Sequence, residues 1–170
     1  MQPETALIAQ HIPRLRRYAR ALTGERARAD DLVQDTLERA LRKLHLWRTG
    51  SDLRAWLFTV MHNVHVNQVR GRAHGAEEAT DPEDLPQPAP ETGADQGDLM
   101  DLEAALARLP DEQREVLLLV GLEQLTYQEA AAVLGIPIGT VMSRLSRARE
   151  RLRALLDGTE SGAMTLKVVK

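Results

Sequence analysis

A short stretch near the C-terminus combines a pair of residues that can cap a helix, a Gly and a Pro that can form a turn, and several closely spaced arginines. Residues 125–149 are LTYQEAAAVLGIPIGTVMSRLSRAR. Thr126, followed three residues later by Glu129, predicts a capping box, in which each side chain accepts a hydrogen bond from the backbone N–H group of the other residue. The pattern therefore predicts that a helix over 127–134 begins at this cap.

The residues after this helix predict a tight turn and a second helix. Gly135 suits the left-handed conformation that often follows a helix, and Pro137 cannot continue one because it lacks an N–H group. A new helix can then begin near Ile138 or Gly139. Two short helices joined by a turn of three or four residues that contains Gly are typical of a helix-turn-helix.

The second helix of this motif divides into an apolar and a polar face. Its predicted buried stripe is Val141, Leu145, Ala148 and Leu152. The residues that project away from the stripe are Gly139, Met142, Ser143, Ser146, Arg147 and Glu150, flanked by Arg144, Arg149 and Arg151. Such a helix can place its first turns on base edges in the major groove and its arginines on phosphates. The alternative interpretation is an ordinary helical hairpin with a basic, solvated face.

The N-terminal half of the chain is predicted to carry an acidic helix face. The pairs Leu32/Val33, Thr36/Leu37 and Ala40/Leu41, followed by Leu44, are mostly apolar and repeat with a helical period. The opposite face of this helix carries Asp31, Gln34, Asp35 and Glu38. This face could bind a basic partner, or it could simply be solvated.

The next predicted helix offers amide side chains that could read bases. The turn before it consists of Arg48, Thr49, Gly50, Ser51 and Asp52. The apolar stripe of the helix is Leu53, Trp56, Leu57, Val60, Met61 and Val64, and another face carries Asn63, Asn67 and Arg70. An Asn side chain has both a donor and an acceptor for a base edge, and an Arg side chain can reach a phosphate. The alternative is that both Asn residues only cap or solvate the helix.

The remaining apolar patterns are helical too, so the sequence predicts an all-α protein. Ile8, Ile12, Leu15, Ala19 and Leu22 predict a helix that stops near Gly24. Leu99, Leu102, Leu106 and Leu109 predict a short helix that ends before Pro110, and Asp111 begins the next one. No stretch with the period of a β-strand competes with these patterns.

Composition divides the chain into two domains. Residues 74–98 contain four Pro, three Gly, one Leu and no aromatic residue, which predicts a disordered linker because so little apolar surface can be buried. The linker separates a domain over 1–73 from a domain over 99–157, and 158–170 is predicted to be a flexible tail. The net charge is +6 over residues 1–73 and −9 over residues 74–101. This separation of charge could favour a polyanionic partner for the basic parts.

Several functions are disfavoured by what the chain lacks. Its 170 residues include no Cys, which excludes disulfides, thiolate metal sites and a cysteine nucleophile. His62 and His65 are spaced to hold a metal, but no third ligand completes a convincing set, so we expect no metal site. No phosphate-binding loop or catalytic motif occurs, so we expect neither an enzyme nor a cofactor. The absence of a membrane-spanning run and of a signal peptide pattern predicts a cytoplasmic protein without membrane insertion.

Three blocks of the chain, in order, resemble bacterial RNA polymerase sigma factors of the extracytoplasmic-function (ECF) type, which belong to the sigma-70 family. The blocks are ADDLVQDTLERAL (29–41), DLRAWLFTVMHNVHVNQVR (52–70) and LPDEQREVLLLVGLEQLTYQEAAAVLGIPIGTVMSRLSRARERL (109–152). The DLRAWLFT phrase is also similar to the general-stress branch of these factors. The resemblance implies two helical domains, called region 2 and region 4, joined by a linker.

For the region 2 domain, the resemblance implies binding to core RNA polymerase and to the promoter −10 element. The residues implied to dock on the clamp helices of the β′ subunit are Asp31, Gln34, Asp35 and Glu38. The residues implied to contact the −10 element are Arg48, Thr49, Gly50 and Ser51, which would hold a flipped base, together with Asn63, Asn67 and Arg70. Flipping a base costs a few kcal/mol, which such contacts must offset.

For the region 4 domain, the resemblance implies contact with the polymerase β flap and recognition of the −35 element as duplex DNA. The residues at the contact positions are Thr140, Met142, Ser143, Arg144, Ser146 and Arg147. Many relatives have a basic residue in place of Met142 and a large one in place of Ser146, so the base preference should differ at those steps. An anti-sigma factor is a further expected partner.

Two other functions remain open from the residues alone. A stand-alone helix-turn-helix regulator would use the C-terminal domain but would leave residues 27–70 unexplained. A sigma-like decoy would sequester an anti-sigma factor and bind no DNA. The presence of Asn63, Asn67 and Arg147 argues weakly against the decoy.

Overall fold

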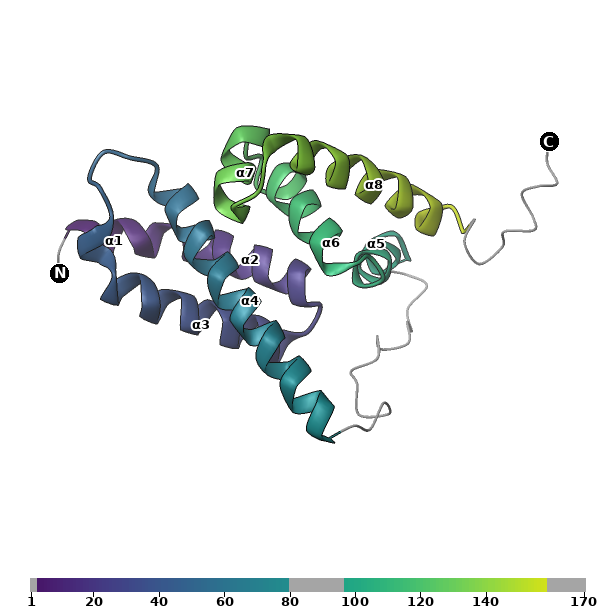
Figure 1. Ribbon diagram of the computed structural model, residues 1–170, viewed down its shortest axis with the longest axis horizontal. Helices are drawn as coiled ribbons and strands as arrows, with labels where there is room; N and C mark the ends of the chain where they lie inside the picture. Colours follow the sequence, from purple (N-terminus) through teal and green to yellow (C-terminus); the bar gives the residue numbers. More distant parts are fainter. Residues whose placement is uncertain (1–2, 80–96, 159–170) are drawn as a thin grey trace. The chain divides into compact units, whose positions relative to one another are not determined.

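The computed structural model describes residues 3–79 and 97–158, and helices dominate both ranges (Figure 1). The described residues contain no β-strand, which confirms the all-α prediction for this part of the chain. The helices are α1 (Pro3–Gln10), α2 (Ile12–Thr23), α3 (Arg26–Arg42), α4 (Leu53–Ala79), α5 (Gly97–Ala107), α6 (Asp111–Leu117), α7 (Tyr127–Leu134) and α8 (Ile138–Leu156), with a 3-10 turn, η1 (Leu44–Leu46), and a π-helical segment, η4 (Leu118–Leu122). They form two compact units, one built on α1 to α4 and the other on α5, α6 and α8.

The first unit is held together by the apolar stripes of α2, α3 and α4. Helix α3 packs against both α2 and α4. Leu15 of α2, Leu32 of α3 and Leu57 of α4 are fully buried. The rings of Tyr18 and Phe58 meet edge to face, with centroids 5.0 Å apart and planes at 69°. Such a pair contributes about 0.5–1.5 kcal/mol beyond the burial of its area.

The helix predicted from the apolar spacing between Ile8 and Leu22 is interrupted at His11. Pro13 causes the interruption because it has no N–H group for the carbonyl of the preceding turn and its ring clashes with that carbonyl. Helix α2 begins again with Pro13 in its first turn, where no N–H donor is needed. The prediction of one continuous helix from the apolar periodicity was therefore wrong.

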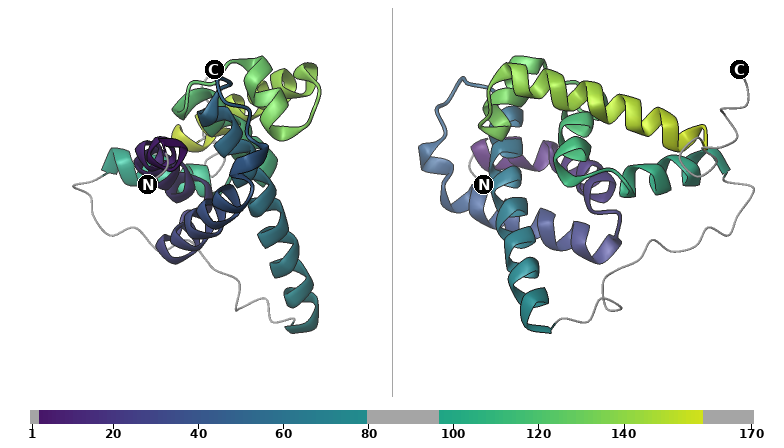
Figure 2. Two further views of the ribbon diagram at one scale, coloured as in Figure 1. Left: turned by 90° about the vertical axis from the view of Figure 1, so that its left-hand side faces the viewer. Right: turned by 45° about the vertical axis from the view of Figure 1, so that its right-hand side comes forward.

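Helix α4 is longer than predicted, and its C-terminal part projects beyond α2 and α3 (Figure 2). It continues through Ala79, past the predicted start of the linker at His74. Residues 73–79 are AHGAEEA, and their Ala and Glu residues favour a helix strongly enough to outweigh one Gly. Since α5 begins at Gly97, helices also occupy both ends of the predicted linker. The rest of that linker and the tail from residue 159 onward lie outside the described residues.

In the second unit, α8 packs against α5 and α6. Val116 of α6 and Leu119 of η4 are fully buried. Of the stripe predicted for α8, the fully buried residues are Val141, Leu145 and Ala148. Leu152 is half-buried, and Leu102 of α5 is exposed. None of the described helices is long and apolar enough to cross a bilayer.

Arg114 joins the end of α5 to α6. Its Nε atom donates to the carbonyl oxygen of Leu106 at 2.7 Å, and its Nη2 atom donates to the carbonyl oxygens of Leu109 at 2.6 Å and Ala107 at 3.2 Å. The carbonyl of Leu106 also accepts the N–H of Leu109 at 3.1 Å, and the guanidinium adds a charged donor to this group of carbonyls where the helix ends, so it acts as a cap. Burial lowers the pKa of Arg114, while Asp111 and Glu115 act to raise it.

Replacing Arg114 with Met should loosen the end of α5. Hydrogen bonds from a charged donor contribute about 1.5–3 kcal/mol, so the amides of α5 should exchange with solvent about 10- to 150-fold faster. Amide hydrogen exchange measures this directly, with the amides of α2 expected to be unchanged. Arg108→Met, at an exposed position in the same segment, is the matched control. Unaltered protection of α5 in the R114M variant would contradict the capping role.

Candidate nucleic-acid interface

The helix-turn-helix begins with the predicted capping box. The backbone N–H of Thr126 donates to Oε1 of Glu129 at 2.8 Å, and the backbone N–H of Glu129 donates to Oγ1 of Thr126 at 3.0 Å. Both interactions satisfy N–H groups that have no partner within α7. The capping box and the bounds of α7 are therefore confirmed.

The turn between α7 and α8 has the predicted backbone conformation. Gly135 has a φ of 69°, in the left-handed region, and the N–H of Ile136 donates to the carbonyl of Ala131 at 3.1 Å. Pro137 directly precedes α8, and its carbonyl accepts the N–H groups of Thr140 and Val141 at 3.0 Å and 3.2 Å. The turn thus fixes where α8 starts and which of its faces is buried.

The outer face of α8 exposes three of the six residues predicted to contact the −35 element, Met142, Ser146 and Arg147. Met142 is 51% exposed, Ile138 is 46% exposed, and Ser146 and Arg147 are also exposed. Thr140 is half-buried near the start of the helix. Because Val141 and Leu145 are buried, the helical period turns Met142, Ser146 and Arg147 outward.

Two predicted contact residues of α8 have partners within the protein. Oγ of Ser143 donates to the carbonyl of Thr140 at 3.2 Å. Nη2 of Arg144 lies 3.7 Å from Oε2 of Glu112, which belongs to α6, and the Arg144 side chain is only 26% exposed. Arg144 therefore helps to join α8 to α6, a role that its position in the sequence did not indicate.

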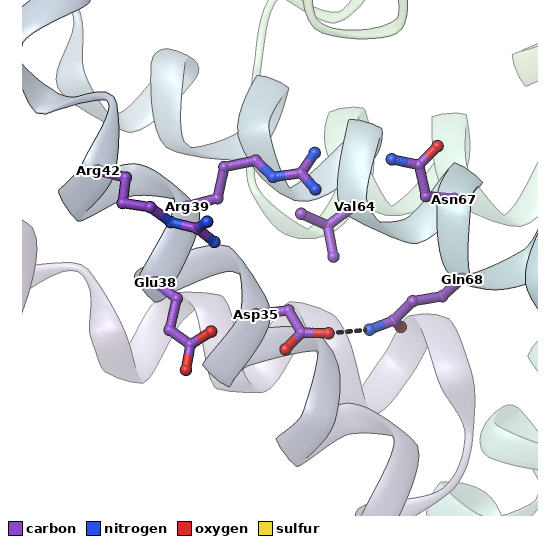
Figure 3. Close-up of a pocket in the computed structure, with 7 residues that line it drawn as sticks. All are labelled: Asp35, Glu38, Arg39, Arg42, Val64, Asn67 and Gln68. Atoms are coloured by element: carbon purple, nitrogen blue, oxygen red, sulfur yellow. Dashed lines mark hydrogen bonds between the residues drawn. The ribbon is translucent and has the colours of Figure 1, made fainter.

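On α3, the predicted acidic face divides in a similar way. Asp31, Gln34 and Glu38 are exposed, whereas Asp35 is half-buried. Oδ2 of Asp35 accepts a hydrogen bond from Nε2 of Gln68 on α4 at 2.8 Å, drawn as the dashed line in Figure 3. Nothing in the sequence singled out Gln68 except its position beside Asn67.

The Asp35–Gln68 pair lies in a hollow between α3 and α4 of about 200 Å³. The residues lining it are Asp35, Glu38, Arg39, Arg42, Val64, Asn67 and Gln68, all of which Figure 3 labels. The hollow brings two residues of the acidic face, Asp35 and Glu38, together with Asn67 of the predicted −10 set. It also shows that Arg39 and Arg42, which sequence reasoning did not select, lie beside the carboxylates.

The turn before α4 is exposed and tightly folded. Its residues Arg48, Thr49, Gly50 and Ser51 are all exposed. Both the N–H and the Oγ of Ser51 donate to the carbonyl of Arg48, at 3.0 Å and 2.7 Å, and Gly50 has a φ of 97°. Oδ1 of Asp52 then accepts the N–H of Ala55 at 3.3 Å, which caps the start of α4.

Along α4, the three residues predicted to contact the −10 element are Asn63, Asn67 and Arg70, and all are exposed. His65 is buried and His62 half-buried, so these two histidines do not form an open pair of metal ligands. Among the described residues, no group of three His, Cys, Asp or Glu side chains could hold a metal ion.

Comparison with known proteins identifies the family. The family model "Sigma2 domain of PhyR" matches residues 8–62, and the family model "Sigma-70, region 4" matches residues 99–152. The ECF RNA polymerase sigma factor EcfG of Rhodopseudomonas palustris is 41% identical over 151 residues, which are 88% of this chain and 83% of that protein. The chain belongs to the ECF sigma factor family. The region 4 match of this ECF sigma factor includes all six residues of the predicted −35 set, whereas its region 2 match ends before Asn63.

Solved structures of sigma factors have the same fold as this ECF sigma factor. The sigma factor RpoE in complex with the anti-sigma factor NepR, from Bartonella quintana, is 38% identical, with a TM-score of 0.78 over 92% of this chain and 98% of that one. CnrH, in complex with the cytosolic domain of CnrY, is 30% identical, with a TM-score of 0.67 over 90% of this chain and 86% of that one.

The turn of the helix-turn-helix offers a matched pair of glycine substitutions. A Cβ atom added at either Gly135 or Gly139 would meet no atom within 4 Å, so neither substitution causes a clash. Gly135→Ala should nevertheless destabilise the protein by about 1–2 kcal/mol, because its φ of 69° disfavours a residue with a Cβ atom. Gly139→Ala should be stabilising by up to about 1 kcal/mol, because Ala favours a helix.

Thermal unfolding of the two variants, compared with the unsubstituted protein, measures both effects. The expected shifts of Tm have opposite signs. Equal shifts for G135A and G139A would mean that the left-handed turn does not constrain the start of α8.

Proposed function

We propose that this ECF sigma factor directs core RNA polymerase to promoters, reading a −35 element with α8 and a −10 element with α4 and the turn before it. The observation that carries the proposal is the exposed polar and basic face of α8, held outward by a capped helix-turn-helix, in a chain of this family. RNA synthesis is the chemistry of the polymerase. The sigma factor itself catalyses no reaction, needs no cofactor and acts in the cytoplasm.

At the −35 element, Arg147 is the residue best suited to read a base. Its side chain is exposed on the outer face of α8, and a guanidinium can donate two hydrogen bonds to the major-groove edge of guanine. Met142 can contact the methyl group of thymine from the same face. Arg144 contributes mainly by fixing α8 on α6, since it pairs with Glu112.

At the −10 element, the exposed turn 48–51 would hold a flipped base while α4 contacts the neighbouring bases and phosphates. Asn63 and Asn67 are one helical turn apart and can each offer a donor and an acceptor to a base edge. Arg70 lies on the same exposed side and can pair with a phosphate. These polar contacts offset the cost of a few kcal/mol for unstacking the base.

Docking on the polymerase would use the exposed acidic residues of α3. Asp31, Gln34 and Glu38 face solvent and can meet basic residues of the β′ clamp helices. Asp35 is engaged with Gln68, so it contributes less unless that hydrogen bond is exchanged. The region 4 unit would contact the β flap.

We also propose that an anti-sigma factor restrains this protein. The similar sigma factor RpoE was solved in complex with the anti-sigma factor NepR. A protein that covers the acidic face of α3 would block docking on the polymerase. This mode of inhibition needs no change in the DNA-reading residues.

Transcription reconstituted from the purified protein, core RNA polymerase and a promoter template tests the proposed function. A sigma factor converts core enzyme, which does not initiate at promoters, into one that starts at a defined site. A stand-alone regulator would bind the promoter without conferring initiation. A decoy would neither bind promoter DNA nor initiate, and either of these results would overturn the proposal.

Arg147→Ala should weaken binding to the −35 element by about 1–3 kcal/mol, or about 5- to 150-fold, if Arg147 reads a guanine. Arg144→Ala should weaken base discrimination less and lower stability more, because Arg144 pairs with Glu112. Promoter-specific transcription on templates with each −35 base varied in turn measures both effects. An unchanged −35 preference in the R147A variant would refute its role.

Asp31→Lys and Glu38→Lys should each weaken binding to core polymerase about tenfold, because reversed charges then face basic residues of the partner. Glu103→Lys, at an exposed position on α5, makes the same change in net charge and is the control. Asp35→Asn should have a smaller effect on docking than either reversal. Titration of labelled core enzyme measures the affinities. Equal losses for E38K and E103K would show that only net charge matters.

A further inference from the structure

A second hollow, distinct from the one between α3 and α4, lies at the interruption between α1 and α2. Its volume is about 370 Å³, and its lining residues are Gln10, His11, Pro13, Arg14 and Arg17. Pro13, which forces the interruption, contributes the only apolar side chain of the lining. The hollow therefore presents mainly cationic and hydrogen-bonding groups.

The charge around this hollow favours an anion. Arg14 and Arg17 line it, and Arg54 acts on His11 through its charge. Burial, followed by the charges of Arg14 and Arg54, lowers the pKa of His11, and Asp52 opposes this shift. The guanidinium groups thus outweigh the one carboxylate that His11 senses, while a neutral imidazole ring still offers an N–H donor.

The hollow is close to the turn that we propose holds a flipped base. Asp52 follows Ser51 directly and Arg54 lies in the first turn of α4, and both act electrostatically on His11. A DNA strand with a base held at residues 48–51 must carry its neighbouring phosphates past the start of α4. Cationic side chains beside that path would neutralise those phosphates.

We propose that the hollow between α1 and α2 binds a backbone phosphate of the unpaired promoter strand next to the −10 contact. This inference rests on the proposed function and adds a site outside α4 and the turn before it. A phosphate fits the lining better than an acidic protein does, because the hollow lacks the apolar anchor residues on which protein interfaces depend. Arg14 and Arg17 would hold the phosphate without reading sequence.

The test measures binding of the holoenzyme, assembled from core polymerase and this sigma factor, to forked −10 promoter DNA with a single-stranded extension. Arg14→Ala and Arg17→Ala should each weaken binding about three- to tenfold on every −10 sequence and reduce the salt dependence by about 0.7–0.9 per lost phosphate contact. Arg17→Lys should retain most of the affinity. Arg16→Ala, at an exposed position of α2 outside the hollow, is the matched control and should change little.

Neutral methylphosphonate linkages, placed at one phosphate at a time, locate the contact without relying on a variant. One linkage should weaken binding of the unsubstituted holoenzyme and have little further effect in the R17A holoenzyme. If no linkage does so, or if R14A and R17A behave like R16A, the inference is overturned while the proposed function stands. Weaker binding to core polymerase, with DNA binding intact, would also overturn it. If the unsubstituted holoenzyme fails to select promoter DNA, both proposals fall.

Discussion

The helical period is the constraint on which the arrangement of the proposed contacts of α3, α4 and α8 depends. A side chain returns to the same face of a helix after three or four residues, so the choice of buried residues also fixes the exposed ones. Burial of Val141, Leu145 and Ala148 turns Met142 and Arg147 of α8 outward. In α3, burial of Leu32 and Val33 leaves Asp31 and Glu38 facing solvent in the same way. With aromatic residues at only 3% of the chain, aliphatic packing carries most of this burial.

Contacts within the protein separate residues that support an interface from residues that are free to form one. Arg144 and Asp35 both have the charge expected of a contact residue, yet Arg144 pairs with Glu112, and Asp35 accepts a hydrogen bond from Gln68. Their neighbours Arg147 and Glu38 are exposed. A charged side chain held by the fold keeps its helix in place, whereas an exposed one can exchange water for a phosphate or a basic partner at lower cost. Substitution of a residue held by the fold should therefore mainly change stability, whereas substitution of an exposed residue should mainly change binding.

Sequence signals that act over a few residues predicted the structure well. The capping box at Thr126, the left-handed turn at Gly135 and the bounds of α7 all depend on neighbours within one turn of helix. Pro13 was also a local signal for the interruption at His11, but the prediction followed the apolar periodicity instead. The pairs Arg144–Glu112 and Asp35–Gln68 join residues from different helices, so their partners depend on tertiary packing that no spacing along the chain reveals. The same holds for Arg114 of α6, which donates to the carbonyl of Leu106 in α5.

The central claim is that one chain contacts two promoter elements only as part of RNA polymerase. Hydroxyl-radical footprinting of a promoter with the assembled holoenzyme tests it most directly. Protection is expected at both the −35 and the −10 element, with loss of the −35 protection alone when Arg147 is replaced by Ala. Protection at both elements by the free protein without core polymerase, or protection of a single element by the holoenzyme, would contradict it.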